Sequence, residues 1–120
     1  IEEISGKKVI GAREPVKIFG PNNEQFETVA KIDTGAYRSS ICYSIAEKIN
    51  LNKSLKKKSV RSALGNEERD IVNLKFLLDN LLIDTEVFLA KRENMKHDMI
   101  IGRKDIKKYL VDASKNVRLK

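Results

Sequence analysis

The sequence contains few of the residues on which metal and disulfide chemistry depends. Its 120 residues include one cysteine, one histidine and no tryptophan. A single thiol, Cys42, excludes a disulfide within the chain, and one thiol with one imidazole cannot form the usual zinc sites. No apolar run approaches the roughly 18 residues that indicate a membrane-spanning helix. We therefore expect no metal, no cofactor and no membrane as a partner.

A basic and apolar leader segment is also absent, and the first residue is Ile1. These features favour a cytoplasmic protein, although an upstream targeting segment stays open because the chain does not begin with Met. The length predicts one domain over residues 1–120.

Positive charge is in excess, with 24 Lys and Arg against 17 Asp and Glu, a net charge of +7. Much of it lies in residues 52–61, around Lys56-Lys57-Lys58. Such a stretch can bind nucleic acid, an acidic polymer or an anionic membrane. No aromatic residues alternate with the lysines to stack on bases, so a solvated loop is favoured and no nucleic-acid partner is expected. The lysines could also steer an acidic substrate.

Alternating apolar and polar residues predict a mainly β chain. Residues 7–19 indicate two short strands broken near Arg13-Glu14-Pro15, with Pro15 at a sheet edge. Residues 26–33 alternate strictly after a turn at 20–24 and place Asp33 at the end of a strand. Residues 71–78 and 81–90 predict a hairpin that turns at Asp79-Asn80, with one apolar face formed by Val72, Leu74, Phe76 and Leu78.

Two short helices are predicted among these strands. One covers residues 41–51, with Ser44 as a candidate cap, and the other covers 102–111. A closing strand is expected near 116–119. This pattern is typical of a small closed β barrel with one or two short helices.

Asp33 is followed by Thr34 and Gly35, and this tripeptide is a candidate catalytic loop. Glycine permits a tight turn and the close approach of a second chain, and the threonine hydroxyl can bond across such an approach. Two carboxylates that meet at a symmetry axis cannot both ionise easily, so they share a proton and can activate water. The tripeptide alone also fits an ordinary turn, because Asp and Gly favour turns.

A second block, "MIIGRKDI" at residues 99–106, favours the catalytic loop over the ordinary turn. "IDTGAYRSS" followed by "MIIGRKDI" resembles the retropepsin-like aspartic peptidases. The blocks "VIGAREPVKIFG", "AKIDTGAYRSSI", "VRSALGNEERDIV" and "MIIGRKDIKKYLVDASKNVRL" also resemble, in order, a bacterial and archaeal family named as ATP-dependent zinc proteases. That family is often encoded beside ATP-grasp amino-acid ligases. The single His and Cys do not support zinc chemistry, so the aspartic mechanism is preferred.

The resemblance implies a single-lobe acid-protease barrel and a role for each matching residue. Asp33 resembles the catalytic acid, and Thr34, Gly35 and Ala36 complete its loop. Ile100, Ile101, Gly102 and Arg103 match the strand that supports the loop, with Arg103 expected in an ion pair. The flap over the substrate is expected at residues 61–69, with candidates Arg61, Ser62, Gly65, Glu68 and Arg69. The sequence departs from the family at Tyr37 and Arg38, and at Cys42 where a histidine is common.

Other reactive residues fit structural roles better. The second Asp-Thr, within residues 83–86, lacks the glycine and is expected to face solvent within a strand. His97 is expected in a loop and Cys42 in the core. Because only one acid motif remains, an active enzyme requires a homodimer with one Asp33 from each copy.

Three functions follow from these motifs. The first is an aspartic endopeptidase or amide hydrolase that acts as a homodimer on a peptide or amino-acid-tailed substrate, including an acidic one. A functional link to an ATP-grasp ligase is part of this hypothesis, since the chain has no phosphate-binding Gly-Lys loop of its own. The second is a catalytically silent binding or dimerisation module on the same fold. The third is a basic nucleic-acid-binding barrel.

Overall fold

The computed structural model describes residues 3–51, 56–62, 65–91 and 95–115. Within them none of the helices is long and apolar enough to cross a membrane. Strands dominate, as the sequence predicts. In chain order the elements are β1 (Glu3–Ile4), β2 (Lys7–Ile10), β3 (Arg13–Phe19), β4 (Gln25–Ile32), β5 (Ser40–Cys42), α1 (Tyr43–Lys48), β6 (Lys56–Ser62), β7 (Gly65–Leu78), β8 (Leu81–Ala90), β9 (Met99–Ile101), the 3-10 turn η2 (Arg103–Asp105) and β10 (Tyr109–Val111).

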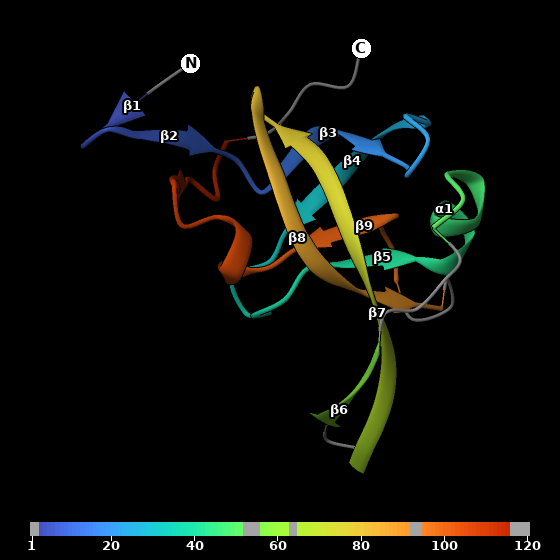
Figure 1. The fold of residues 1–120 in the computed structure, drawn as a ribbon. Helices are drawn as coiled ribbons and strands as arrows, with labels where there is room; N and C mark the ends of the chain where they lie inside the picture. Colours follow the sequence, from blue (N-terminus) through green and yellow to red (C-terminus); the bar gives the residue numbers. More distant parts are fainter. Residues whose placement is uncertain (1–2, 52–55, 63–64, 92–94, 116–120) are drawn as a thin grey trace.

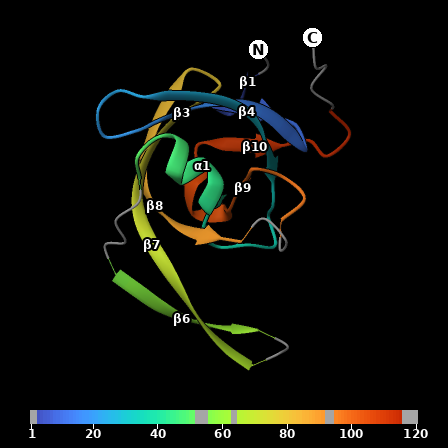
Figure 2. The same ribbon diagram turned by 90° about the vertical axis from the view of Figure 1, so that its right-hand side faces the viewer.

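Six strands form a closed barrel in the order β3-β4-β9-β5-β8-β7, and the antiparallel pairing of β3 with β7 closes the ring (Figure 1). β1, β2 and β10 form a separate small sheet. The β6–β7 hairpin projects away from the barrel, as the two views in Figures 1 and 2 show. The mainly β closed barrel with few helices is therefore confirmed.

The β7–β8 hairpin is the longest pairing and contributes much of the core. Val72, Leu74, Phe76 and Leu78 are each at most 1% exposed, because they share the inner face of β7. Asp79 and Asn80 both have positive φ, at 49° and 65°, the geometry of a two-residue turn that matches the twist of its strands. The predicted hairpin and its turn are confirmed.

The break between the first strands lies two residues earlier than predicted. β2 ends at Ile10 and β3 begins at Arg13, so the chain breaks at Gly11-Ala12. Gly11 packs against the carbonyl group of Lys115, where a Cβ would collide. Pro15 lies inside β3 opposite Val29 of β4, but the pairing with β7 starts only at Val16. Its missing N–H therefore costs no bond on the β7 side.

One predicted helix is shorter than expected and the other is absent. α1 begins after Cys42, so Ser44 lies inside the helix and does not cap it, and Ile41 belongs to β5. The helix predicted over 102–111 is wrong. The chain forms only the turn η2 there, because Tyr109–Val111 pairs in parallel with β2. The closing strand near 116–119 lies outside the described residues.

Candidate active site

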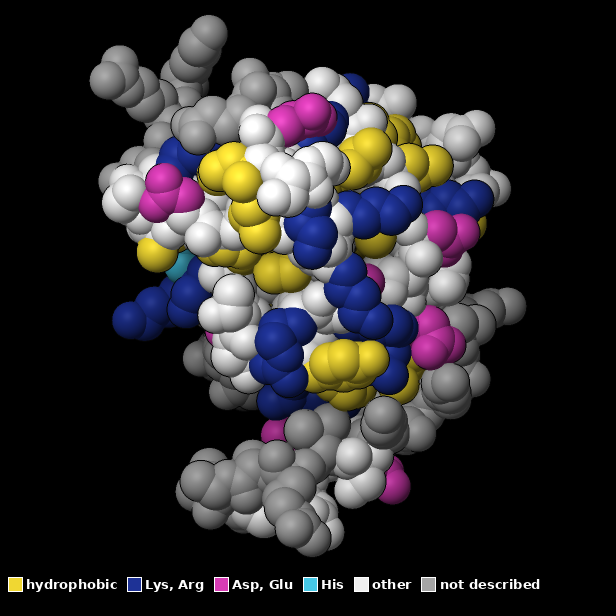
Figure 3. Space-filling view, turned by 90° about the vertical axis from the view of Figure 1, so that its left-hand side faces the viewer, with side chains coloured by type: hydrophobic (Ala, Val, Ile, Leu, Met, Phe, Trp, Pro, Cys, Tyr) yellow, Lys and Arg dark blue, Asp and Glu magenta, His cyan; other side chains and the backbone are white. Residues whose placement is uncertain are grey.

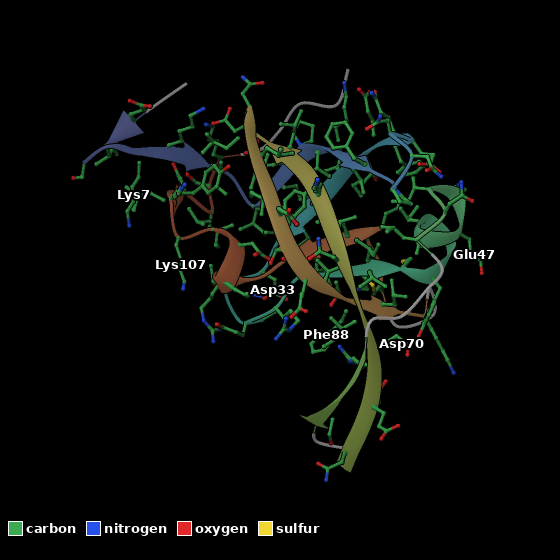
Figure 4. The ribbon with its side chains drawn as sticks, in the orientation of Figure 1. Lys7, Asp33, Glu47, Asp70, Phe88 and Lys107 are labelled. Atoms are coloured by element: carbon green, nitrogen blue, oxygen red, sulfur yellow. The ribbon has the colours of Figure 1, made fainter. Side chains whose placement is uncertain are left out.

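The loop that carries Asp33 arches over the end of β9. β9 lies between β4 and β5, parallel to the first and antiparallel to the second. The chain therefore leaves β4 at Ile32, crosses above β9 and returns as β5 from Ser40. The Asp33 N–H donates to the Ile101 carbonyl at 2.9 Å. The two sequence blocks singled out above are thus adjacent in space (Figure 4).

Asp33 is half-buried and holds its own loop in shape. Its Oδ1 accepts a hydrogen bond from the Gly35 N–H at 2.9 Å, and its carbonyl accepts one from the Ala36 N–H at 3.2 Å. These bonds orient the carboxylate from the rigid end of β4, as a reactive acid requires. Thr34 and Gly35, at the tip of the loop, are exposed.

Gly102 supports this loop from below. The Arg103 N–H donates to the Ala36 carbonyl at 2.8 Å, and the Lys104 N–H donates to the Tyr37 carbonyl at 2.9 Å. The backbones approach so closely that a side chain at Gly102 would overlap the loop. The expected packing of the Gly102 strand beneath the Asp33 loop is present.

A buried polar contact that the sequence analysis missed joins the same two segments. Ser39 is fully buried, and its hydroxyl donates to Asp105 Oδ2 at 2.6 Å while accepting from the Gly102 N–H at 3.1 Å. Ser39 follows a polar loop and carries no apolar periodicity, so only its position beneath the arch reveals this role.

Arg103 contacts the loop tip in a way that differs from the prediction. The contact found is a hydrogen bond from its Nη1 to the Thr34 carbonyl at 2.8 Å, where an ion pair was expected. The guanidinium also lies 5.9 Å from the centre of the Tyr37 ring, which is 53% exposed. Tyr37 and Arg103 therefore flank the exposed tip at Thr34.

Arg38, the second departure from the family pattern, turns toward the barrel wall. Its side chain is 11% exposed and pairs with Glu86 Oε1 at 3.5 Å. It also lies 5.4 Å from the centre of the Phe88 ring. Neighbouring residues thus take opposite environments, with Tyr37 in solvent and Arg38 against β8.

A cavity of about 580 Å³ lies between the Asp33 loop and the root of the β6–β7 hairpin. Residues from the Asp33 loop, α1, the hairpin and β8 line it, including Asp33, Arg38, Tyr43, Glu68, Arg69 and Phe88. Of the flap candidates, Glu68 and Arg69 line the cavity, and Gly65 begins β7 with a φ of +113°. The backbones of Arg61 and Ser62 pair in the hairpin, and their side chains lie outside the described residues. The hairpin is thus placed to cover the cavity.

The root of the hairpin is tied to α1 by one hydrogen bond. The Tyr43 hydroxyl donates to Asp70 Oδ2 at 2.6 Å. Burial, with added effects from this bond and the Asp70 charge, raises the pKa of Tyr43 to about 12. Tyr43 therefore stays neutral and keeps its proton available to Asp70 at physiological pH.

The remaining reactive residues have structural positions. Asp84 is exposed and accepts from Asn73 Nδ2 at 2.7 Å, while Thr85 is buried. Cys42 is fully buried 3.8 Å from the sulfur of Met95, and His97 precedes β9 in a loop, as expected. In the part of the chain that the structure describes, no group of three His, Cys, Asp or Glu could hold a metal ion.

Basic side chains gather on one side of the molecule. Lys7 and Lys107 extend from this side in Figure 4, and Figure 3 shows many Lys and Arg side chains there with few acids between them. The side chains of Lys56, Lys57 and Lys58 lie outside the described residues, so their predicted steering role stays a prediction.

Comparison with known protein families assigns the chain to one family. The profile of the RimB-like family, described as retropepsin-like aspartic endopeptidase RimB, matches residues 45–119. The chain belongs to this family. The match confirms the retropepsin-like resemblance. The family is described as an aspartic endopeptidase, and zinc is not part of that description. The matched segment includes β9 and Gly102 and begins after Asp33, so the role of Asp33 depends on the geometry above. A comparison with curated proteins finds no match.

Solved structures share the fold. A Legionella pneumophila protein of unknown function aligns with a TM-score of 0.59 and 16% identity, over 90% of this chain and 94% of that one. The simian foamy virus protease aligns with a TM-score of 0.57 and 13% identity, over 78% and 90% of the two chains. The retroviral protease-like domain of Ddi1 from Leishmania major gives a TM-score of 0.55 and 19% identity, over 85% and 75%. The barrel is therefore a retropepsin-like, aspartic-protease-like fold.

Proposed function

We propose that this protein is an aspartic endopeptidase or amide hydrolase whose active site forms between two copies of the chain. One observation carries the proposal: Asp33 borders the cavity beneath the hairpin, while the tip of its loop at Thr34-Gly35 is exposed. An exposed tip can meet the same tip of a second copy around a two-fold axis. The two Asp33 carboxylates would then lie side by side.

The chemistry follows from that pairing. Two adjacent carboxylates share one proton, because both cannot ionise easily at short range. The ionised Asp33 accepts a proton from water as the water oxygen attacks the scissile carbonyl carbon. The neutral Asp33 donates its proton to the carbonyl oxygen, and proton transfer to the nitrogen then releases the amine. The Thr34 hydroxyls would bond between the two loops, while the hairpin excludes water from above.

The proposed substrate is a peptide or a protein with added amino acids, including acidic ones. The net charge of +7 and the basic side seen in Figure 3 support an acidic substrate, because opposite charge raises the rate of encounter. An ATP-grasp ligase that adds such residues is the proposed functional partner. The catalytically silent binding module is the alternative.

Substitution of the acid tests the activity. We expect Asp33→Asn to abolish hydrolysis of acidic and neutral test peptides while the fold and the oligomeric state persist. Asp84→Asn is the matched control, since Asp84 also precedes a threonine but is exposed on β8. Hydrolysis that survives in Asp33→Asn would overturn the proposal.

Mixing subunits tests the shared site. When wild-type and Asp33→Asn chains exchange in equal amounts, about a quarter of the dimers retain two Asp33 residues, and activity should fall to that fraction. Activity that falls only to half would mean that each chain works alone. A monomer by light scattering at every concentration tested, together with no hydrolysis, would favour the silent module.

A further inference from the structure

Phe88 lies where the hairpin leaves the barrel. It is on β8, opposite Ile71 of β7 and Ser40 of β5. Its side chain borders the cavity and the residue is 9% exposed. Figure 4 shows Phe88 at the root of the β6–β7 hairpin, near Asp70.

Two guanidinium groups from separate segments lie against this one ring. Arg38, from the loop that carries Asp33, is 5.4 Å from the ring centre, and Arg69, from the hairpin, is 5.6 Å from it. Both distances are within the range of cation–π attraction. Each arginine also has a carboxylate partner, Glu86 at 3.5 Å for Arg38 and Glu67 at 3.7 Å for Arg69, which offsets the repulsion between the two cations.

The two arginines differ in what holds them. Glu86 is on β8 with Phe88, so the Arg38–Glu86 ion pair belongs to the barrel and would not move with the hairpin. Glu67 and Arg69 are both on β7, in the part before Ile71 where the pairing with β8 begins. Their ion pair would move with the hairpin. The Tyr43–Asp70 hydrogen bond fixes the adjacent residue, so a swing of the hairpin would separate Arg69 from Phe88 first.

We propose that Phe88 is a positioning residue that holds the hairpin over the cavity through Arg69 and the Asp33 loop through Arg38. One ring thereby sets the placement of both walls of the site. The meaning of this placement for catalysis rests on the proposed function, but the contact between Phe88 and the hairpin does not.

The first test measures hairpin mobility without substrate. A spin label is attached at Asn66→Cys, an exposed hairpin position, while the native Cys42 is buried. We expect Phe88→Leu to raise the population of mobile label about two- to fivefold, the factor that one lost cation–π contact implies. Phe88→Tyr, which keeps an aromatic face, should restore the wild-type spectrum.

A matched control exists elsewhere in the chain. Phe26 lies 5.2 Å from the Lys48 ammonium, away from the cavity, so Phe26→Leu removes the same kind of contact and should leave the label unchanged. If Phe88→Leu fails to fold, Arg69→Gln should loosen the hairpin in the same way, because Arg69 is partly exposed. A label as immobile in Arg69→Gln as in the wild type, or failure of Phe88→Tyr to restore it, would overturn the proposal.

The second test uses kinetics. Phe88 places both the hairpin and the Asp33 loop, so we expect Phe88→Leu to raise KM about two- to fivefold and also to lower kcat. Arg69→Gln loosens only the hairpin, so it should raise KM with kcat nearly unchanged. A fall in kcat alone contradicts the positioning role. If the wild-type protein hydrolyses nothing, the proposed function fails, and the label experiment still decides the role of Phe88.

Discussion

Gly102 lies directly against the backbone of Tyr37. A Cβ placed on Gly102 would stand 2.6 Å from the Tyr37 carbonyl oxygen and 2.8 Å from the Arg38 carbonyl carbon. The nearest atoms belong to the backbone and cannot rotate away. The arch of the Asp33 loop over β9 therefore depends on the absence of a side chain at one position.

Substitution of this glycine should both destabilise the protein and displace the loop. We expect Gly102→Ala to lower the free energy of unfolding by about 1–3 kcal/mol, the usual cost of overpacking. Gly35→Ala is the control, since its Cβ would meet only the Asp33 carboxylate oxygen at 3.2 Å. Urea unfolding of both variants measures the difference. Equal stability of Gly102→Ala and wild type would contradict the packing described.

Loss of the buried Ser39 hydroxyl should also weaken the site. Ser39→Ala leaves Asp105 and the Gly102 N–H without this partner, so we expect a loss of about 1–3 kcal/mol in urea unfolding. Ser114→Ala is the matched control. Its hydroxyl donates to Asp112 at the same 2.6 Å, but both residues are exposed, and little change is expected. Similar losses in the two variants would show that burial does not matter here.

Alkaline pH should weaken the attachment of the hairpin root. The pKa of Tyr43 is raised to about 12 from its ordinary value of 10.0, so the native protein retains the proton longer than the unfolded chain. Its contribution to stability is complete below pH 10 and is lost as the pH rises toward 12. Tyr43→Phe should show a shallower fall in stability over this range. If stability falls equally with pH in Tyr43→Phe and the wild type, the proton of Tyr43 does not contribute to stability as described.

A β-branched side chain in the turn at Asp79-Asn80 should destabilise the protein. Asn80 has a φ of 65°, which β-branched residues adopt only with strain. We expect Asn80→Val to cost about 1–3 kcal/mol, whereas Asn80→Gly keeps the turn. Thermal unfolding compares the two. A stable valine variant would indicate a different turn.

The local sequence pattern was sufficient to predict the structure where residues close in sequence are also close in space. Phe76 and Leu78 alternate with exposed or half-exposed residues, so the β7–β8 hairpin could be predicted from periodicity and its turn residues. The strand end directly before Asp33 was predicted for the same reason. The resemblance of the two distant motifs then placed Gly102 beneath the loop.

Helix patterns failed where tertiary pairing took over. The spacing of Ile106, Tyr109 and Leu110 fits a helix, yet Tyr109–Val111 completes a sheet with β2, whose residues precede their partners by 101 positions in the chain. The backbone groups of β10 need hydrogen-bond partners, and β2 supplies them through the parallel pairing. No local pattern carries that information.

By itself the sequence determined the strand-rich barrel, the acid at a strand end and the single copy of that motif. Only the tertiary structure decided that Ser39 and Asp105 join beneath the arch, and that Arg38 turns inward while Tyr37 faces solvent. It also brought Arg38 and Arg69 to the same Phe88 ring. Periodicity reports which side of a strand is buried, whereas contacts between distant polar residues depend on how the barrel closes.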